Sequence, residues 1–259
     1  LWFGPHPDDE FYASPLIGHY CLDLGWKCTL VVLTRGEGGS CALPGGCLPD
    51  LETVRLEEMR ASAALLGAEL DSWDLGDNGR FEPYAGDVQD VLQLWASREG
   101  NLDALVARVA SAITERAPTL VLTVDPRHGN YCHPTHRATG AVVVSAIQEL
   151  GATAPPLEMV ASRGATLQEG LGFVPVVPSD PTLTSFDATV YSTTLRGEAW
   201  GFFPRVLRAH PSQFAVSDRE LELLASAPAE NKRVFLVSLS DVTRDDPRYR
   251  DLCPPSTFL

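Results

Sequence analysis

The sequence predicts an α/β fold: a Rossmann-like, mostly parallel sheet with helices on both faces, in a single domain over residues 1–259. Two observations predict it. Short apolar runs alternate with amphipathic helical patterns through the first two-thirds of the chain, an order that gives parallel strands covered by helices. One run, residues 28–34, is apolar and β-branched almost throughout, as in a strand buried on both faces. No linker or internal repeat divides the sequence.

Five strands of the parallel sheet are expected in chain order, each a short apolar run. They lie at residues 1–4, 28–34, 71–75, 119–124 and 157–161. The last third of the chain is less regular, and its strand-like stretches are residues 174–177, 188–191 and 234–239.

The ends of the helices are marked in the sequence. One helix begins at Ser14-Pro15, where an N-cap precedes a proline at the first helical position, and ends at Gly25. Residues 50–66 form a helix that Gly67 terminates. The other expected helices are one that Asn101 caps, residues 136–150, a short helix at residues 204–209, and one within an excursion at residues 80–100.

Composition disfavours several classes of partner. The formal net charge is −14, so no basic surface for nucleic acid or for an anionic membrane is expected. No apolar run approaches the ~20 residues that a membrane span needs. The sequence opens directly on the first strand without a signal peptide, which favours a cytoplasmic location and leaves a secreted form open. The oligomeric state stays open as well.

The six cysteines are too few for a disulfide scaffold in a chain of this length. Cys21 and Cys28 have apolar neighbours and are expected to be buried small side chains, as is Cys132. Cys41 and Cys47 bracket a glycine- and proline-rich loop, and they are candidates for a local disulfide in an oxidising compartment. No CxxC pair suggests a structural zinc site.

The first chemical motif, Pro5-His6-Pro7-Asp8-Asp9-Glu10, directly follows the first strand. In a doubly wound sheet the reactive groups gather at the carboxyl ends of the strands. Two adjacent ionised aspartates repel each other unless a cation is near, and imidazole with carboxylate is a common donor set for zinc or iron. The alternative is that Asp8 and Asp9 only cap the coming helix.

The second motif runs from Asp125 to His136 after the fourth expected strand, and it holds three of the six histidines. With His6 and Asp9, His136 would complete a set of two histidines and one carboxylate, which leaves a position open for water as catalytic zinc sites do. Such a set also accepts Fe²⁺ or Co²⁺. A third histidine, His128, is a candidate for ordering the loop or for touching substrate.

Together the two motifs resemble the LmbE-like/PIG-L family of N-acetylglucosaminyl deacetylases, which has PHPDDE after its first strand and His-Pro-x-His at the start of a later helix. Weaker likenesses follow in order along the chain: Thr34-Arg35-Gly36-Glu37, Arg55-Leu56-Glu57-Glu58, Asp77-Asn78-Gly79 and His210-Pro211-Ser212-Gln213. One departure is Thr135, where the family usually has aspartate. It affects the orientation of an imidazole or a substrate contact, and not a metal ligand.

The resemblance implies a Rossmann-like, zinc-dependent deacetylase that acts on a small-molecule amino sugar. At the matching positions His6, Asp9 and His136 would bind zinc. Asp8 would be the general base, and His133 would stabilise the oxyanion and protonate the leaving amine. The residues implied to lie near the substrate are Arg55, Asp125 and His210.

Other functions stay open at this point. An amidase acting on a thiol conjugate or an antibiotic precursor would use the same site. A metal- or sugar-binding module without catalysis has no use for a base and an oxyanion partner, so Asp8 and His133 argue against it. Residues 36–39 lack the spacing of a nucleotide fingerprint. At most one or two aromatic residues are expected to stack on a sugar, from the set Trp73, Trp95, Trp200, Phe202 and Phe203.

Overall fold

The computed structural model describes residues 1–77, 88–127, 129–160, 165–168, 172–175 and 184–239. Its centre is a seven-stranded sheet in the order β3-β2-β1-β4-β5-β11-β8. The strands are β1 (Trp2–Gly4), β2 (Thr29–Val32), β3 (Glu69–Ser72), β4 (Val121–Val124), β5 (Leu157–Val160), β8 (Thr184–Asp187) and β11 (Arg233–Ser238). Two small sheets pair β6 (Ala165–Gln168) with β7 (Gly172–Pro175), and β9 (Tyr191–Ser192) with β10 (Gly197–Glu198).

The first five strands are parallel, and the last two are antiparallel to their neighbours. The predicted mostly parallel, Rossmann-like sheet is therefore confirmed. The chain builds outward from β1 through β2 to β3, then returns to add β4 on the other side of β1. The connections after β1 and β4 consequently diverge, and they leave a crevice at the carboxyl ends of these two strands, where ligands bind in such sheets.

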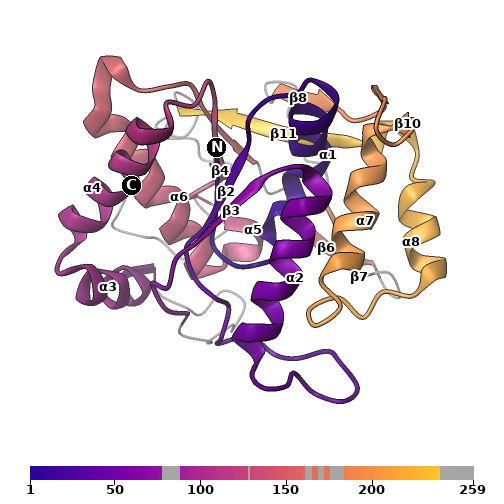
Figure 1. Ribbon diagram of the computed structural model, residues 1–259, viewed down its shortest axis with the longest axis horizontal. Coiled ribbons are helices and arrows are strands. Elements are labelled where there is room, and N and C mark those ends of the chain that lie inside the picture. Colours follow the sequence, from indigo (N-terminus) through magenta and orange to yellow (C-terminus); the bar gives the residue numbers. More distant parts are fainter. Residues whose placement is uncertain (78–87, 128, 161–164, 169–171, 176–183, 240–259) are drawn as a thin grey trace.

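Helices cover both faces of the sheet, as predicted (Figure 1). One buried core lies between the sheet and α3, α4 and α6, and a second lies between the sheet and α1, α2 and α7. The α-helices are α1 (Ser14–Gly18), α2 (Leu51–Leu66), α3 (Val88–Glu99), α4 (Leu102–Arg116), α5 (Gly129–Cys132), α6 (Pro134–Leu150), α7 (Phe202–Ala209) and α8 (Asp218–Ala225). Shorter turns are η1 (Asp9–Ala13), η2 (His19–Asp23), η3 (Gly151–Thr153), η4 (Ala199–Gly201) and η5 (Ala229–Asn231).

Three predicted helix ends are confirmed by their capping geometry. The side chain of Asp50 accepts a hydrogen bond from the Thr53 backbone N–H at the start of α2, and Gly67 ends this helix in the left-handed conformation, with φ of 69°. Asn101 likewise accepts from the Ala104 N–H at the start of α4. The expected helix within residues 80–100 is present as α3, and residues 80–87 of that excursion lie outside the described residues.

The helix predicted to start at Ser14-Pro15 is confirmed as α1, with Pro15 in its first turn, but two local details differ from prediction. Ser14 does not cap this helix, because its hydroxyl donates to the Phe11 carbonyl inside the 3₁₀ turn that precedes α1. Residues 188–191 are not one strand. The Asp187 carboxylate accepts hydrogen bonds from the N–H and hydroxyl of Thr189, so it turns the chain between β8 and β9.

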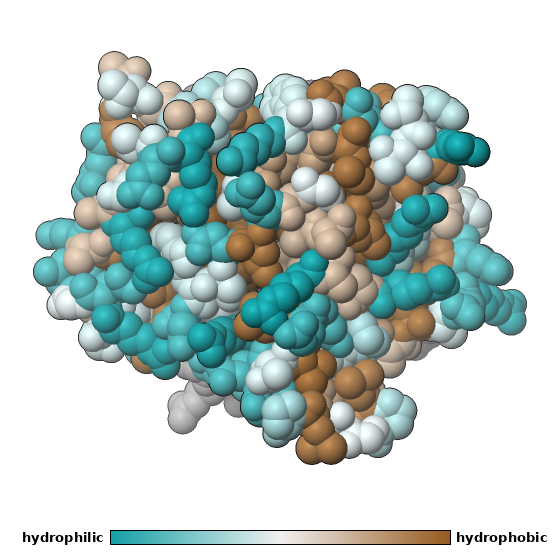
Figure 2. Space-filling view, in the orientation of Figure 1, coloured by the Kyte–Doolittle hydropathy of each residue, from teal (hydrophilic) through white to brown (hydrophobic). Residues whose placement is uncertain are grey.

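The cysteines follow expectation in part. Cys21 and Cys28 form a disulfide, because the chain turns back at Gly25 (φ 69°) and brings their Cα atoms to 5.8 Å. The Cys41–Cys47 disulfide is confirmed. It lies in an exposed loop ahead of α2. The tip of this loop carries hydrophobic surface in Figure 2. Cys132 is buried as expected, and it is disulfide-bonded too.

None of the helices in the described ranges combines the length and apolar character that a membrane crossing requires.

Candidate active site

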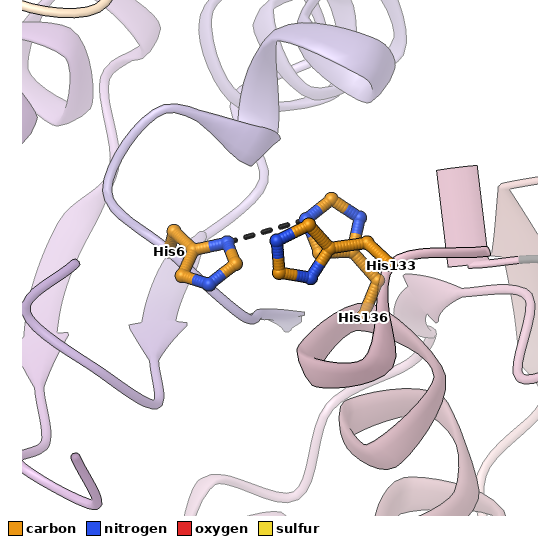
Figure 3. Close-up of side chains that lie close together, drawn as sticks. All are labelled: His6, His133 and His136. Carbon is orange, nitrogen blue, oxygen red and sulfur yellow. Dashed lines mark hydrogen bonds between the residues drawn. The ribbon is translucent and has the colours of Figure 1, made fainter. Parts of the chain in front are cut away.

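The candidate site lies in the crevice between the ends of β1 and β4. Asp8 and Asp9 follow β1 together with His6, and His133 and His136 lie at the start of α6, beyond β4. Figure 3 shows the three histidine rings facing one another from these two segments. The predicted convergence of the two motifs is therefore confirmed.

Three histidine side chains and one carboxylate form the centre of the site. Ring nitrogens of His6, His133 and His136 lie within 4.8 Å of one another, close enough to hold a metal ion. The Asp9 carboxylate contacts two of them: Oδ2 is 3.0 Å from His6 Nδ1, and Oδ1 is 3.3 Å from His136 Nε2. Those two nitrogens are 3.2 Å apart. Zinc bonds of roughly 2.0–2.1 Å place tetrahedral ligand atoms about 3.3 Å apart, so these donors fit such an ion.

The start of α6 explains the placement of its two histidines. His133 is the N-cap, and its Nδ1 accepts a hydrogen bond from the Thr135 N–H at 3.3 Å. The proton of the neutral ring is therefore on Nε2. Pro134 favours the first helical position, and His136 follows one turn after His133 on the same face of the helix. The Thr135 hydroxyl, at the position where the family usually has aspartate, is buried without a hydrogen-bond partner among the described residues.

Asp8 has an uncommon backbone conformation, with φ of 146° and ψ of −24°. Such conformations cost about 1–3 kcal/mol in residues other than glycine and require support from their surroundings. Arg55 provides part of it. Its Nη2 lies 2.9 Å from both the Pro7 carbonyl and Asp8 Oδ1, and its Nη1 donates to the Gly36 carbonyl. A Cβ on Gly36 would lie 2.2 Å from Nη1, so this guanidinium position requires a glycine there.

Burial and neighbouring charges shift the pKa values of the site. Burial raises the pKa of Asp8 to about 6, and Asp9 adds to this while Arg55 opposes it. Burial alone would lower the pKa of His6, but the carboxylates of Asp77 and Asp9 outweigh it and raise that pKa to about 10. A divalent cation would take the place of this proton.

The other two histidines are shifted in the opposite direction. Burial, with the charge of His6 added, lowers the pKa of His133 to about 3. Burial also lowers the pKa of His136 well below its usual value, and neighbouring histidines add to the effect. Both rings are therefore neutral near pH 7, which is the form that a metal ligand or a neutral hydrogen-bond donor requires.

Asp77 belongs to the site although the sequence pointed to it only as part of a weak likeness. Its Oδ1 lies 3.7 Å from His6 Nε2, opposite the nitrogen that contacts Asp9. Its backbone N–H donates to the Glu37 carboxylate at 3.0 Å. A carboxylate on the far nitrogen of a ligating histidine orients the ring and raises its basicity. The signal in the sequence was its place after the third strand.

The three residues predicted to contact substrate are almost fully buried. Arg55 is 3% exposed and bonds to Asp8, and Asp125 is 1% exposed and bonds to the backbone and guanidinium of Arg127. Substrate contact by all three stays a prediction. His210 is the most enclosed of them. Its exposure is 0%, and its Nε2 lies 2.6 Å from Glu10 Oε1, so the side chain is enclosed. His128 lies outside the described residues.

The aromatic candidates for sugar stacking are mostly core residues. Trp73, Trp95, Trp200 and Phe202 are at most 8% exposed. Phe203 is half-buried and stacks on Trp200, with ring centroids 4.8 Å apart. The described side chains therefore provide Phe203 as the most exposed candidate of this set.

A parallel sheet with a buried histidine and carboxylate cluster at its switch point, and a second aspartate beside that cluster, is the arrangement of a metal-dependent hydrolase. Residues 1–147 match the model of the PIG-L family, described as GlcNAc-PI de-N-acetylase. The chain belongs to this family, and its class of activity is hydrolysis of the N-acetyl group of a glucosamine-type substrate.

A curated relative agrees with this assignment, and solved structures agree with the fold. The 1D-myo-inositol 2-acetamido-2-deoxy-alpha-D-glucopyranoside deacetylase of Mycolicibacterium gilvum is 27% identical over 202 residues, which are 75% of this chain and 70% of that protein. Among solved structures, the A40926 pseudoaglycone deacetylase Dbv21 has a TM-score of 0.60 at 19% identity, covering 92% of this chain and 95% of that one. The 4-carboxy-2-hydroxymuconate hydratase GalB from Pseudomonas putida has a TM-score of 0.53 at 18% identity, covering 86% and 81%. At such identities these structures support the fold alone.

Proposed function

We propose that this chain is a zinc-dependent N-deacetylase in which His6, Asp9 and His136 bind the metal, Asp8 is the general base and His133 is the oxyanion partner. The observation that carries the proposal is the mutual spacing of 3.0–3.3 Å among the donor atoms of the three ligands. A bound zinc ion would lower the pKa of a water molecule and polarise the acyl carbonyl. The same donor set would also accept Fe²⁺ or Co²⁺.

Asp8 has the properties of a base that works near neutral pH. With a pKa of about 6 it is mostly ionised at pH 7, yet basic enough to accept a proton from an attacking water. The salt bridge to Arg55 fixes one carboxylate oxygen, Oδ1. In this proposal the other oxygen, Oδ2, accepts the proton of the attacking water. Arg55 therefore orients the base in this proposal.

His133 is suited to donate a hydrogen bond rather than a full charge. Its Nδ1 is used by the Thr135 N–H, so Nε2–H is the group directed at a developing oxyanion. Its pKa of about 3 keeps the ring neutral before substrate binds. Negative charge that develops on the substrate would raise this pKa, and the ring could then carry a proton to the leaving amine.

For the substrate, we propose a small molecule in which an N-acetylglucosamine unit is linked to a second group. The family description and the Mycolicibacterium relative both refer to such a conjugate. The rival substrates are a thiol conjugate and an antibiotic precursor. The fold is also that of the deacetylase Dbv21, which acts on the pseudoaglycone of the antimicrobial reagent A40926. An N-acyl group longer than acetyl is a further variant of the same reaction.

Acetate release from a panel of N-acetylglucosamine conjugates tests this function, measured before chelation, after chelation and with zinc restored. We expect release that chelation abolishes and zinc restores. Asp8→Asn should retain zinc and lose turnover. Near-normal turnover of Asp8→Asn with zinc bound would disprove the assignment of the base. Release only from non-sugar amides would move the substrate to the rival classes.

We also propose that the chain works in an oxidising compartment rather than in the cytoplasm. Every cysteine among the described residues is disulfide-bonded, and disulfides persist mainly outside reducing compartments. Maleimide labelling of the denatured, unreduced protein from its own cells checks this proposal. We expect no labelled cysteine, and labelling of Cys21, Cys28, Cys41 or Cys47 would contradict it.

A further inference from the structure

A buried polar cluster lies directly behind the proposed metal loop and takes no part in the chemistry proposed above. Glu10, Ser62 and His210 each have 0% exposure, and we call them the Glu10 cluster. Glu10 Oε1 accepts a hydrogen bond from the Ser62 hydroxyl at 2.5 Å and lies 2.6 Å from His210 Nε2. The three residues come from η1, from α2 and from the end of α7.

Glu10 and His210 each stabilise the charged form of the other. Burial alone would lower the pKa of His210, but Glu10 and, beyond it, Asp8 and Glu58 outweigh this and raise that pKa. Burial would raise the pKa of Glu10, but His210 and Ser62 outweigh it and lower that pKa. An isolated buried charge is costly, so each partner depends on the other.

Glu10 lies two residues after Asp8, whose backbone φ is 146°. Sparsely populated conformations of this kind persist only where the surrounding structure fixes them. On the N-terminal side the fixed point is the Pro7 carbonyl, which accepts from Arg55. On the C-terminal side it is the Glu10 side chain, which Ser62 and His210 hold. Asp8 and Asp9 are thus the only two residues between two buried attachment points.

The segment that carries His210 also reaches the loop after β2. The N–H and hydroxyl of Ser212 donate to the Glu58 carboxylate, and the Ser212 carbonyl accepts from the Ala42 N–H at 2.7 Å. The Gln213 amide donates to the Ser40 carbonyl. This segment lies beyond residue 147, where the match to the family model ends. The C-terminal part of the chain therefore supports two loops at the edge of the site.

We propose that His210 and Ser62 are positioning residues that act through Glu10 to hold Asp8 and Asp9 in their working conformation. The inference rests on the proposed function. Without the Glu10 cluster the backbone at Asp8 would relax toward a common conformation. The Asp8 carboxylate would then move away from the attacking water, and the Asp9 carboxylate would move away from the metal. Substrate binding should change little, because none of the three side chains is exposed.

The test compares His210→Ala with His210→Gln in the full chain. Zinc affinity is measured by chelator competition, the visible spectrum is recorded with Co²⁺, and kcat and KM are measured on the cleaved substrate. For His210→Ala we expect kcat and zinc affinity each to fall by about 10–100-fold, the range for residues that orient metal ligands, with KM within about two-fold. The Co²⁺ spectrum should also change.

His210→Gln is the rescue variant, because its amide N–H can still donate to Glu10 Oε1. It should recover most of kcat and zinc affinity. Ser62→Ala removes one of the two hydrogen bonds to Glu10 and should give a smaller change in the same direction, which keeps the test available if His210→Ala does not fold. The matched control is His19→Ala, which breaks another His–carboxylate pair, with Asp23 at 3.1 Å, and should leave kcat and zinc affinity unchanged.

Wild-type kcat and zinc affinity in folded His210→Ala would overturn the inference. Equal losses in His210→Ala and His19→Ala would also overturn it, since they would reflect stability alone. The outcomes are separable from failure of the proposed function. If wild-type protein cleaves no amide but binds zinc, the ratio of zinc affinities between His210→Ala and wild type still tests the positioning role.

Discussion

Two aspartates with largely enclosed side chains, Asp8 and Asp23, illustrate opposite uses of a buried carboxylate. Asp23 Oδ1 accepts hydrogen bonds from the hydroxyls of Ser192 and Thr193 and from the Thr194 N–H. Burial would raise its pKa, but these donors outweigh burial and lower the pKa to about 2. Burial dominates at Asp8 and raises its pKa to about 6.

The difference lies in how completely each charge is satisfied. At Asp23 the fold supplies several donors to one oxygen, and the other oxygen lies 3.1 Å from His19, so the carboxylate joins η2 to the β9 region. At Asp8 a single guanidinium contacts one oxygen, the backbone is strained, and a second carboxylate is adjacent. A fold retains such an arrangement where a reaction needs it. Asp23 should therefore affect stability, and Asp8 should affect chemistry.

The largest expected effect comes from removing a metal ligand. His136→Ala should reduce bound zinc below one tenth of an equivalent and acetate release to background, because two donors remain from a set of three. Elemental analysis and the acetate assay measure both quantities. The control is His19→Ala, which should keep full zinc. Full zinc content in His136→Ala would remove this histidine from the ligand set.

Asp8→Asn should have the next largest effect. Loss of a general base typically costs about 10²–10⁴-fold in rate, and we expect kcat to fall by that amount. Zinc content should stay at the wild-type level. The free energy of unfolding should stay within about 0.5 kcal/mol or rise, because a desolvated charge is removed. A drop in stability like that of an Asp23 variant would erase the contrast between the two aspartates.

The sequence predicted the features of the fold and the site that depend on local signals. The motif at His6 to Glu10 follows a strand that its apolar run marks, and Gly67 and Asn101 mark helix ends within a few residues. Parallel order then places the strand ends together. The convergence of the site followed from these signals alone.

The parts that escaped prediction depend on contacts between distant segments. His210 is 200 residues from Glu10, and Asp23 is about 170 residues from its three donors, so no spacing in the sequence links them. The Cys21–Cys28 disulfide is local, but it depends on the turn at Gly25, which apolar neighbours do not reveal. The same limit applies to Asp77, whose role depends on the position of His6.

The Cys21–Cys28 disulfide closes the segment that contains Asp23. Removing it tests whether this segment affects stability and leaves the chemistry at Asp8 unchanged. A double Cys21→Ser and Cys28→Ser variant should lose roughly 2.5 kcal/mol of stability, the chain-entropy expectation for a loop of this size. Zinc content and kcat should not change. Urea unfolding and the acetate assay measure these values. Substitution is preferable to a reductant, because reduction would also act on Cys132 beside His133.

The smallest expected effect is the acid sensitivity that Asp23 confers. Its side chain is 3% exposed, and its folded pKa of about 2 lies below the ordinary aspartate value of 3.8. A depressed pKa stabilises the fold fully above about pH 4, and this contribution is lost as pH falls toward 2. Between pH 7 and pH 3 the loss of stability is about 1 kcal/mol.

Asn at this position keeps an acceptor oxygen but does not titrate. Asp23→Asn should therefore be less stable than wild type at pH 7, and the difference in the free energy of unfolding should narrow by about 1 kcal/mol at pH 3. Urea unfolding of both proteins at the two pH values measures the gap. Equal losses of stability in wild type and Asp23→Asn between the two pH values would show that the Asp23 carboxylate is no better stabilised in the folded state than in the unfolded chain. The contrast with Asp8 would then rest on chemistry alone.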